Sequence, residues 1–125
     1  MIWIAIGATI AALGVGAGAF GAHVLQHKLS PYELGIFETA VRYQMYHVAG
    51  FMALGLTASH IDHFGLRLSG IFMTFGVLTF SGSLYLLVAT GQKWLGAVAP
   101  IGGVALILAW LSLATTLTHM MILKA

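Results

Sequence analysis

The chain has 125 residues, of which 6% are charged and 60% are hydrophobic, and its mean hydropathy is +1.00. A soluble domain would carry about a quarter charged residues, so this composition excludes a water-soluble surface. The absence of cysteine excludes disulfides and thiolate chemistry, and a net charge of +2, scattered along the chain, does not indicate a nucleic-acid partner.

The few charges divide the chain into four charge-free stretches, each long enough to cross a bilayer as a helix of about 20 residues. The sequence therefore predicts an all-α membrane protein with one domain, residues 1–125, in contact with membrane lipid. The four transmembrane helices are expected at about residues 2–24, 43–59, 66–90 and 94–121.

The first helix is rich in small residues, with Gly14, Gly18 and Gly21 along it. Glycine lets helix backbones approach closely in lipid, where packing drives association. We expect this face to meet another helix, either within the same chain or in a homo-oligomer. The segment lacks the basic start of a signal peptide, so we expect it to be a retained transmembrane helix.

The next segment, residues 31–42, begins with the helix-start signal Ser30-Pro31 and an acidic Glu33 in the first turn. Its apolar residues fall on one face, which predicts a short amphipathic interfacial helix. Short polar turns follow the second and third transmembrane helices, so we expect sequential helices to be antiparallel neighbours in an up-down bundle. Pro100 near the start of the fourth helix indicates a kink or a close helix contact.

Four crossings would place both termini and the turn at Asp62 on one side of the membrane. The other side would carry three Lys or Arg residues against two, namely Lys28, Arg42 and Lys93 against Arg67 and Lys124. The excess of positive charge predicts that the larger loop is cytoplasmic and the termini are outside.

The densest group of polar residues enters the second helix, and a second group lies on the third. Ionisable residues at membrane depth usually face the bundle and pair. They form a candidate polar site that is either a structural clamp tying helices together or a proton or small-solute site with Glu38 and His47 as its titrating members. The candidates are Glu38, Arg42, Tyr43, Gln44, His47, Ser81, Ser83 and Tyr85.

Six histidines stand out in so apolar a chain. His23 and His47 are expected near one membrane face, and His60 and His119 near the other, which could provide two bis-histidine haem sites. A transition-metal site using His23, His27 and His47 is a further alternative. Boundary histidines also bond to backbone or headgroups, so the prediction is no metal and no cofactor.

Four segments resemble the signature segments of one family: residues 18–23, 39–47, 80–85 and 95–103. It is the family of uncharacterised small membrane proteins that includes bacterial YgdD and YwdK and eukaryotic transmembrane protein 256. The resemblance implies a multi-pass protein, in bacteria of the cytoplasmic membrane, whose function is unassigned, and it supplies no catalytic residue. From the residues themselves, we expect a non-enzymatic protein that acts by packing or assembly. The alternatives are a proton- or solute-conducting bundle with Glu38, Arg42 and His47 at its polar site, and haem or metal binding.

Overall fold

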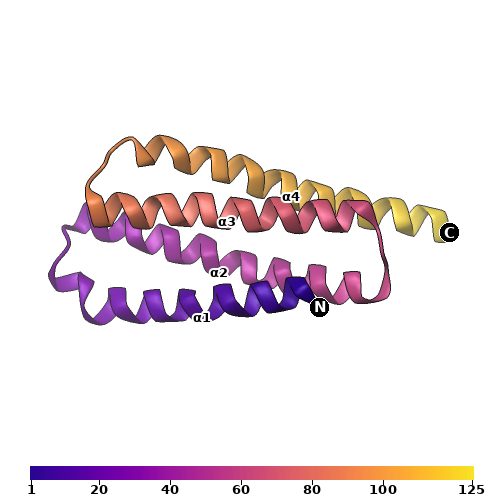
Figure 1. Ribbon diagram of the computed structural model, residues 1–125, viewed down its shortest axis with the longest axis horizontal. Coiled ribbons are helices and arrows are strands. Elements are labelled where there is room, and N and C mark those ends of the chain that lie inside the picture. The colour runs from indigo at the N-terminus through magenta and orange to yellow at the C-terminus, as the bar shows by residue number, and fades with distance from the viewer.

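The computed structural model describes all 125 residues and is helical almost throughout (Figure 1). The predicted all-α class is confirmed. Three of the helices, including α1 with the turn that follows it, are long and apolar enough to cross a membrane. The elements are α1 (Ile2–His23), a 3-10 turn η1 (Leu25–His27), α2 (Pro31–His60), α3 (Phe64–Thr90) and α4 (Leu95–Lys124).

Helix α2 corrects the prediction of an interfacial helix over 31–42 followed by a transmembrane helix over 43–59, because one helix runs through both segments. Its start is the predicted one: the Ser30 hydroxyl accepts from the Glu33 N–H, and the Glu33 carboxylate accepts from the Ser30 N–H. Its buried side chains then recur at spacings of three and four across residue 42, so a single face is buried along the whole helix. They are Phe37, Ala40, Gln44, His47, Phe51 and Leu54.

Each helix packs against the next one in the chain: α1 on α2, α2 on α3, and α3 on α4. Figure 1 shows neighbouring helices running in opposite directions, with both termini and the α2–α3 connection toward one end of the molecule. The charged residues Lys28, Asp62 and Lys93 lie in the three connections. These three charges therefore lie between helices, as expected, whereas Glu38 and Arg42 lie within α2.

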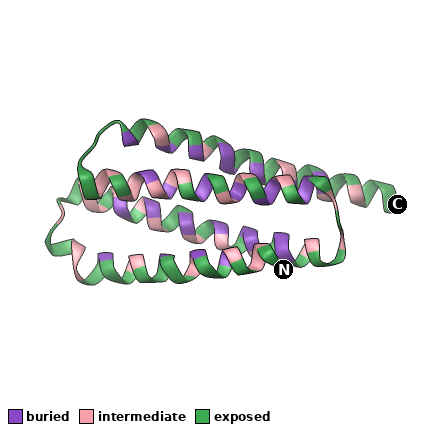
Figure 2. Cartoon of the chain, in the orientation of Figure 1, coloured by how far each residue is buried: buried purple, intermediate pink, exposed green.

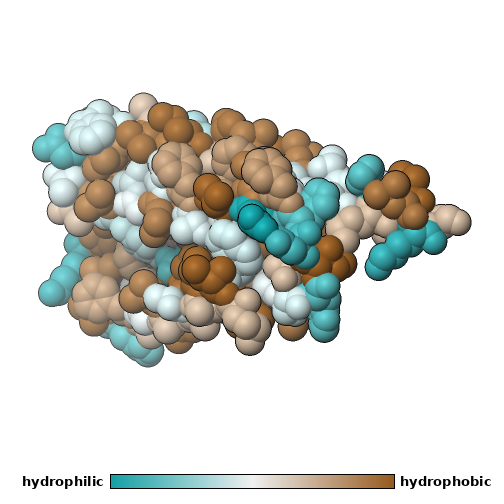
Figure 3. Space-filling view, turned by 45° about the vertical axis from the view of Figure 1, so that its right-hand side comes forward, coloured by the Kyte–Doolittle hydropathy of each residue, from teal (hydrophilic) through white to brown (hydrophobic).

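The core lies between the helices, and the buried parts of the ribbon in Figure 2 face inward while the outer faces are exposed. Its largest cluster takes residues from all four helices: Ile10, Phe51, Met73, Val77, Leu106 and Ala109. Large apolar side chains stand exposed on all four helices, and Leu13, Leu56, Leu78 and Leu111 are each more than half exposed. Figure 3 shows apolar side chains over much of one face. An apolar exterior of this extent suits lipid.

Helices α3 and α4 approach each other closely at Gly102. A side chain there would collide with the backbone nitrogen of Phe80, whereas one at the adjacent Gly103 would meet only the Phe80 ring, at 3.7 Å. Pro100 lies inside α4, which continues through it. Of the two expectations for the proline segment, the structure thus shows a close helix contact.

Candidate functional site

The buried polar centre of the protein is built around Gln44 on α2, which is 6% exposed. Its Nε2 donates to the carbonyl of Ile10 on α1 at 2.8 Å, and its Oε1 accepts from the hydroxyl of Tyr85 on α3 at 2.6 Å. One amide therefore joins three helices. We call Gln44, Tyr85 and Ser81, with the carbonyls they bond, the Gln44 network.

Ser81 completes the Gln44 network by donating to the carbonyl of Ala40 on α2 at 2.7 Å. Gln44, Ser81 and Tyr85 line a groove of about 220 Å³ between α1, α2 and α3. No fully enclosed side-chain nitrogen or oxygen in the protein lacks a hydrogen-bond partner. The hydrogen bonds of the Gln44 network run between helices, so the network holds neighbouring helices together.

Hydrogen bonds from serine hydroxyls to backbone carbonyls also join α3 and α4, toward the other end of the bundle. The Ser69 hydroxyl donates to the Ala109 carbonyl at 2.8 Å, and the Ser112 hydroxyl donates to the Gly65 carbonyl at 2.9 Å. Interhelical hydroxyl bonds of this kind replace hydrogen bonds that water would make in a soluble protein. Sequence reasoning did not single out these serines, because a serine that crosses to another helix looks the same in sequence as one that bonds its own backbone.

The structure separates Glu38 and Arg42 from the Gln44 network. Their side chains are each more than half exposed and form an ion pair of 3.6 Å along α2. Both line a surface groove with Gly18, Gly21 and other residues of α1 and α2. The pair is thus a surface feature of the α1–α2 contact, and exposed pairs of this kind contribute little to stability.

Two other predicted members are also outside the network. Tyr43 is 42% exposed and its ring packs on Phe80, with centroids 4.6 Å apart. Ser83 is buried but bonds the Phe80 carbonyl of its own helix at 2.9 Å. The eight candidates therefore do not form one site: three share the Gln44 network and the rest point elsewhere.

His47 lies near the middle of α2 and is 6% exposed. Its Nδ1 lies 2.5 Å from the carbonyl oxygen of Tyr43, and its ring lies 6.0 Å from that of Trp110 on α4. It borders a third groove, of about 470 Å³, between α2, α3 and α4, which we call the imidazole groove. The groove is lined by Tyr43, His47, Phe80, Pro100, Gly103, Val104, Leu106, Ile107 and Trp110.

Of the two histidine pairs considered for haem, His23 and His47 are not brought together. Gly21, two residues before His23, packs against Phe37, and Phe37 precedes His47 by ten residues, which is about 15 Å along a helix. His47 is therefore deeper than the sequence suggested, because α2 starts at Pro31 rather than at residue 43. The protein contains no group of three or more His, Cys, Asp or Glu residues placed to hold a metal ion.

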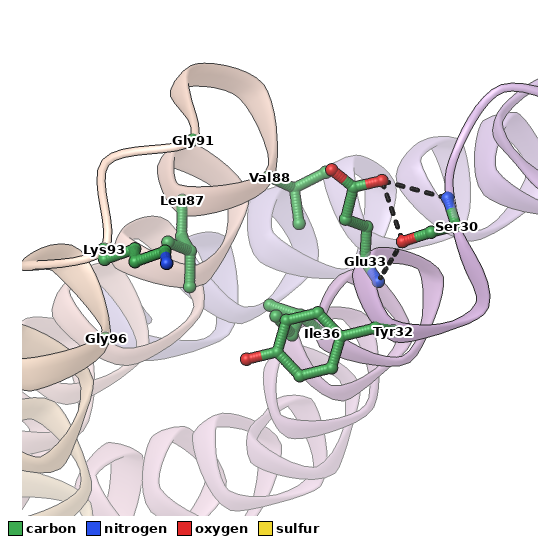
Figure 4. Close-up of a pocket in the computed structure, with 9 residues that line it drawn as sticks. All are labelled: Ser30, Tyr32, Glu33, Ile36, Leu87, Val88, Gly91, Lys93 and Gly96. Carbon is green, nitrogen blue, oxygen red and sulfur yellow. Dashed lines mark hydrogen bonds between the residues drawn. The ribbon is translucent and has the colours of Figure 1, made fainter.

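A further cavity, of about 770 Å³, lies at one end of the bundle between the start of α2 and the α3–α4 turn (Figure 4). Its polar groups include Tyr32, Glu33 and Lys93. The backbone N–H and hydroxyl of Ser30 lower the pKa of the Glu33 carboxyl, because both bond to it. That carboxylate is therefore occupied with capping the helix. Sequence reasoning missed the cavity because it needs the α3–α4 turn beside the start of α2.

The predicted glycine face of α1 lies against α2 of the same chain. A side chain at Gly14 would meet the Met45 sulfur at 2.5 Å, and one at Gly21 would meet the Phe37 ring at 2.6 Å. Gly18 lies at the edge of this face, in ordinary contact with Val41. Of the two alternatives, the structure shows packing within the chain.

Comparison with known proteins finds relatives that are described as membrane proteins and a family whose function is unknown. Residues 17–103 match the family described as "Protein of unknown function (DUF423)". A UPF0382 membrane protein of Staphylococcus saprophyticus is 45% identical over 112 residues, which cover 90% of this chain and 92% of that protein. The UPF0382 membrane protein YwdK of Bacillus subtilis is 41% identical over 111 residues, covering 88% and 90% of the two chains. No solved structure matches.

Proposed function

The chain belongs to the DUF423 family, whose curated relatives are named UPF0382 membrane proteins, and from that premise we propose that it is a non-enzymatic membrane protein that works by assembly with copies of itself. In this proposal all four helices cross the cytoplasmic membrane of a bacterium in an up-down bundle, and the termini are outside. The bacterial relatives and the three-to-two excess of Lys and Arg on the opposite side support this placement.

The observation that carries the proposal is that α1 has two faces of small residues and uses only one of them inside the chain. Gly14 and Gly16 are two residues apart, which turns a helix by about 200°. Gly14 is buried against α2, whereas Gly16 is exposed and has open space where a side chain would be. The outer face carries a stripe of exposed small residues, bordered by larger exposed ones such as Val15 and Phe20. The small residues are Ala5, Ala8, Ala12, Gly16 and Ala19.

Three of these residues, Ala8, Ala12 and Gly16, recur every four positions, which is the small-xxx-small spacing of helix pairs in membranes. The exposed faces of α3 and α4 carry bulky residues such as Leu78 and Leu111, and α2 has a shorter exposed pair at this spacing, Ala49 and Ala53. A flat, small-residue face lets a second backbone approach closely, where dispersion contacts accumulate. The assembly surface is therefore the outer face of α1, not the Gly14–Gly21 face.

The Gln44 network supports the non-enzymatic part of the proposal. Its side chains bond backbone carbonyls and one another, which leaves no nucleophile with an adjacent base and acid. The alternative of conduction through Glu38, Arg42 and His47 has weaker support, because the ion pair is at the surface.

The test is the oligomeric state of Gly16→Leu in detergent and in lipid nanodiscs, with Gly82→Leu on α3 as a matched control, since Gly82 also has open space around it. We expect Gly16→Leu to shift the population toward monomer with its helix content unchanged, and Gly82→Leu to behave as the wild type. An unchanged assembly in Gly16→Leu would refute the proposed surface.

A further inference from the structure

One nitrogen in the middle of the protein has no partner, and it belongs to His47. A backbone carbonyl only accepts hydrogen bonds, so the bond to the Tyr43 carbonyl places the hydrogen of the neutral imidazole on Nδ1. Nε2 then carries a free lone pair and has no protein donor. Because no fully enclosed side-chain nitrogen lacks a partner, Nε2 is not fully enclosed, and we infer that it opens onto the imidazole groove, which His47 lines.

The walls of the groove suit a planar ring. The rings of Tyr43 and Phe80 pack together with centroids 4.6 Å apart, and Trp110 stands beside the imidazole at 6.0 Å. Aromatic side chains prefer offset or edge contacts with a further ring. Gly103 leaves room in the groove, since a side chain there would touch only the Phe80 ring, at 3.7 Å and beyond.

We propose that the imidazole groove binds a membrane-soluble molecule of the phenol or hydroquinone class, with its hydroxyl donating to Nε2 of His47. The groove lies near the middle of α2 and along the first half of α4, between Pro100 and Trp110, so we expect its ligand to enter from lipid rather than from water. A lipid acyl chain would fill the space but would leave the nitrogen unpaired, which is costly in an apolar setting. A ring with one hydroxyl satisfies both the walls and the nitrogen.

The test compares two probes that differ only in the donor: 2-naphthol and its methyl ether, 2-methoxynaphthalene. Full-length protein in detergent micelles, with ¹⁵N-labelled histidine, is titrated with each probe and followed by the Nε2 signal of His47. The His47→Gln variant identifies that signal. We expect saturable binding of 2-naphthol with one site per chain, roughly tenfold tighter than that of the ether, and a shift of Nε2 with 2-naphthol only.

Two variants locate the binding. Gly103→Leu places a larger side chain in the imidazole groove, at a position where a Cβ would contact only the Phe80 ring, and should abolish saturable binding of 2-naphthol. Gly82→Leu makes the same change in the groove of the Gln44 network and should leave binding intact. Equal affinity for the two probes in the wild type would overturn the proposal without reference to any variant. Saturable binding that survives in a folded Gly103→Leu protein would also overturn it.

Discussion

The hydrogen bond between Tyr85 and Gln44 should stabilise the fold, and a double-mutant cycle can measure its contribution to the free energy of unfolding. Tyr85→Phe removes only the hydroxyl that donates to Gln44, and Gln44→Leu removes that bond together with the one to Ile10. Hydrogen bonds between membrane helices average about 0.6 kcal/mol and reach about 1.7 kcal/mol. At 2.6 Å, to an acceptor on a buried side chain, this bond belongs in the upper half of that range.

We therefore expect Tyr85→Phe to lower the free energy of unfolding by about 1 kcal/mol, and Gln44→Leu by about 2 kcal/mol because it loses two bonds. The double variant should lose no more than Gln44→Leu alone, which gives a coupling energy of about 1 kcal/mol. The measurement is an unfolding titration with dodecyl sulfate in mixed micelles, followed by circular dichroism.

The control cycle pairs Tyr85→Phe with Ser69→Ala. Ser69 bonds the Ala109 carbonyl on α4 and shares no partner with Tyr85. These two changes should add to within about 0.5 kcal/mol. If the Tyr85–Gln44 cycle were also additive, the coupling energy would be zero, and the bond would not stabilise the contact between α2 and α3.

Two further predictions concern helix packing and pH. Gly102→Ala should destabilise the protein by about 1–3 kcal/mol because its methyl group would collide with the α3 backbone, while Gly103→Ala should be near neutral; equal effects in the same titration would contradict this account. The pKa of Asp62 is lowered by its bond to Arg67 and the charge of that guanidinium, so this carboxylate stabilises the fold above the ordinary aspartate pKa of about 3.9 and ceases to do so as the pH falls through the lowered value. Wild type should therefore lose more thermal stability between pH 6 and pH 3 at low salt than Asp62→Asn does, and identical losses would contradict the assignment.

The helix ends were predictable because a charge is costly within a bilayer, so Lys28, Asp62 and Lys93 had to lie in connections. The continuity of α2 was not predicted, although the signal was present. Charges at Glu38 and Arg42 suggested a boundary, whereas the spacing of its buried residues continues past them. A charge on the outward face of a helix does not end it, because the side chain can reach water or headgroups.

The polar site was predictable in its residue types and only partly in its members. Tyr85 does bond Gln44, and Ser81 bonds the α2 backbone at Ala40, one turn before Gln44, because α2 and α3 pack through these faces. Glu38 and Arg42 do not join them, because their face of α2 points outward. Which face of a helix meets which neighbour depends on long-range packing. The identity of a polar residue does not indicate whether its side chain points to the core or to the outside.

The proposed assembly through the outer face of α1 can be tested directly in native membranes, because the chain has no cysteine and single cysteines can be introduced cleanly. Ala12→Cys places a thiol on that face, and Leu111→Cys places one on the exposed side of α4. Oxidative cross-linking should give a covalent dimer with Ala12→Cys and none with Leu111→Cys. Absence of a dimer with Ala12→Cys, or equal cross-linking at both positions, would contradict the account.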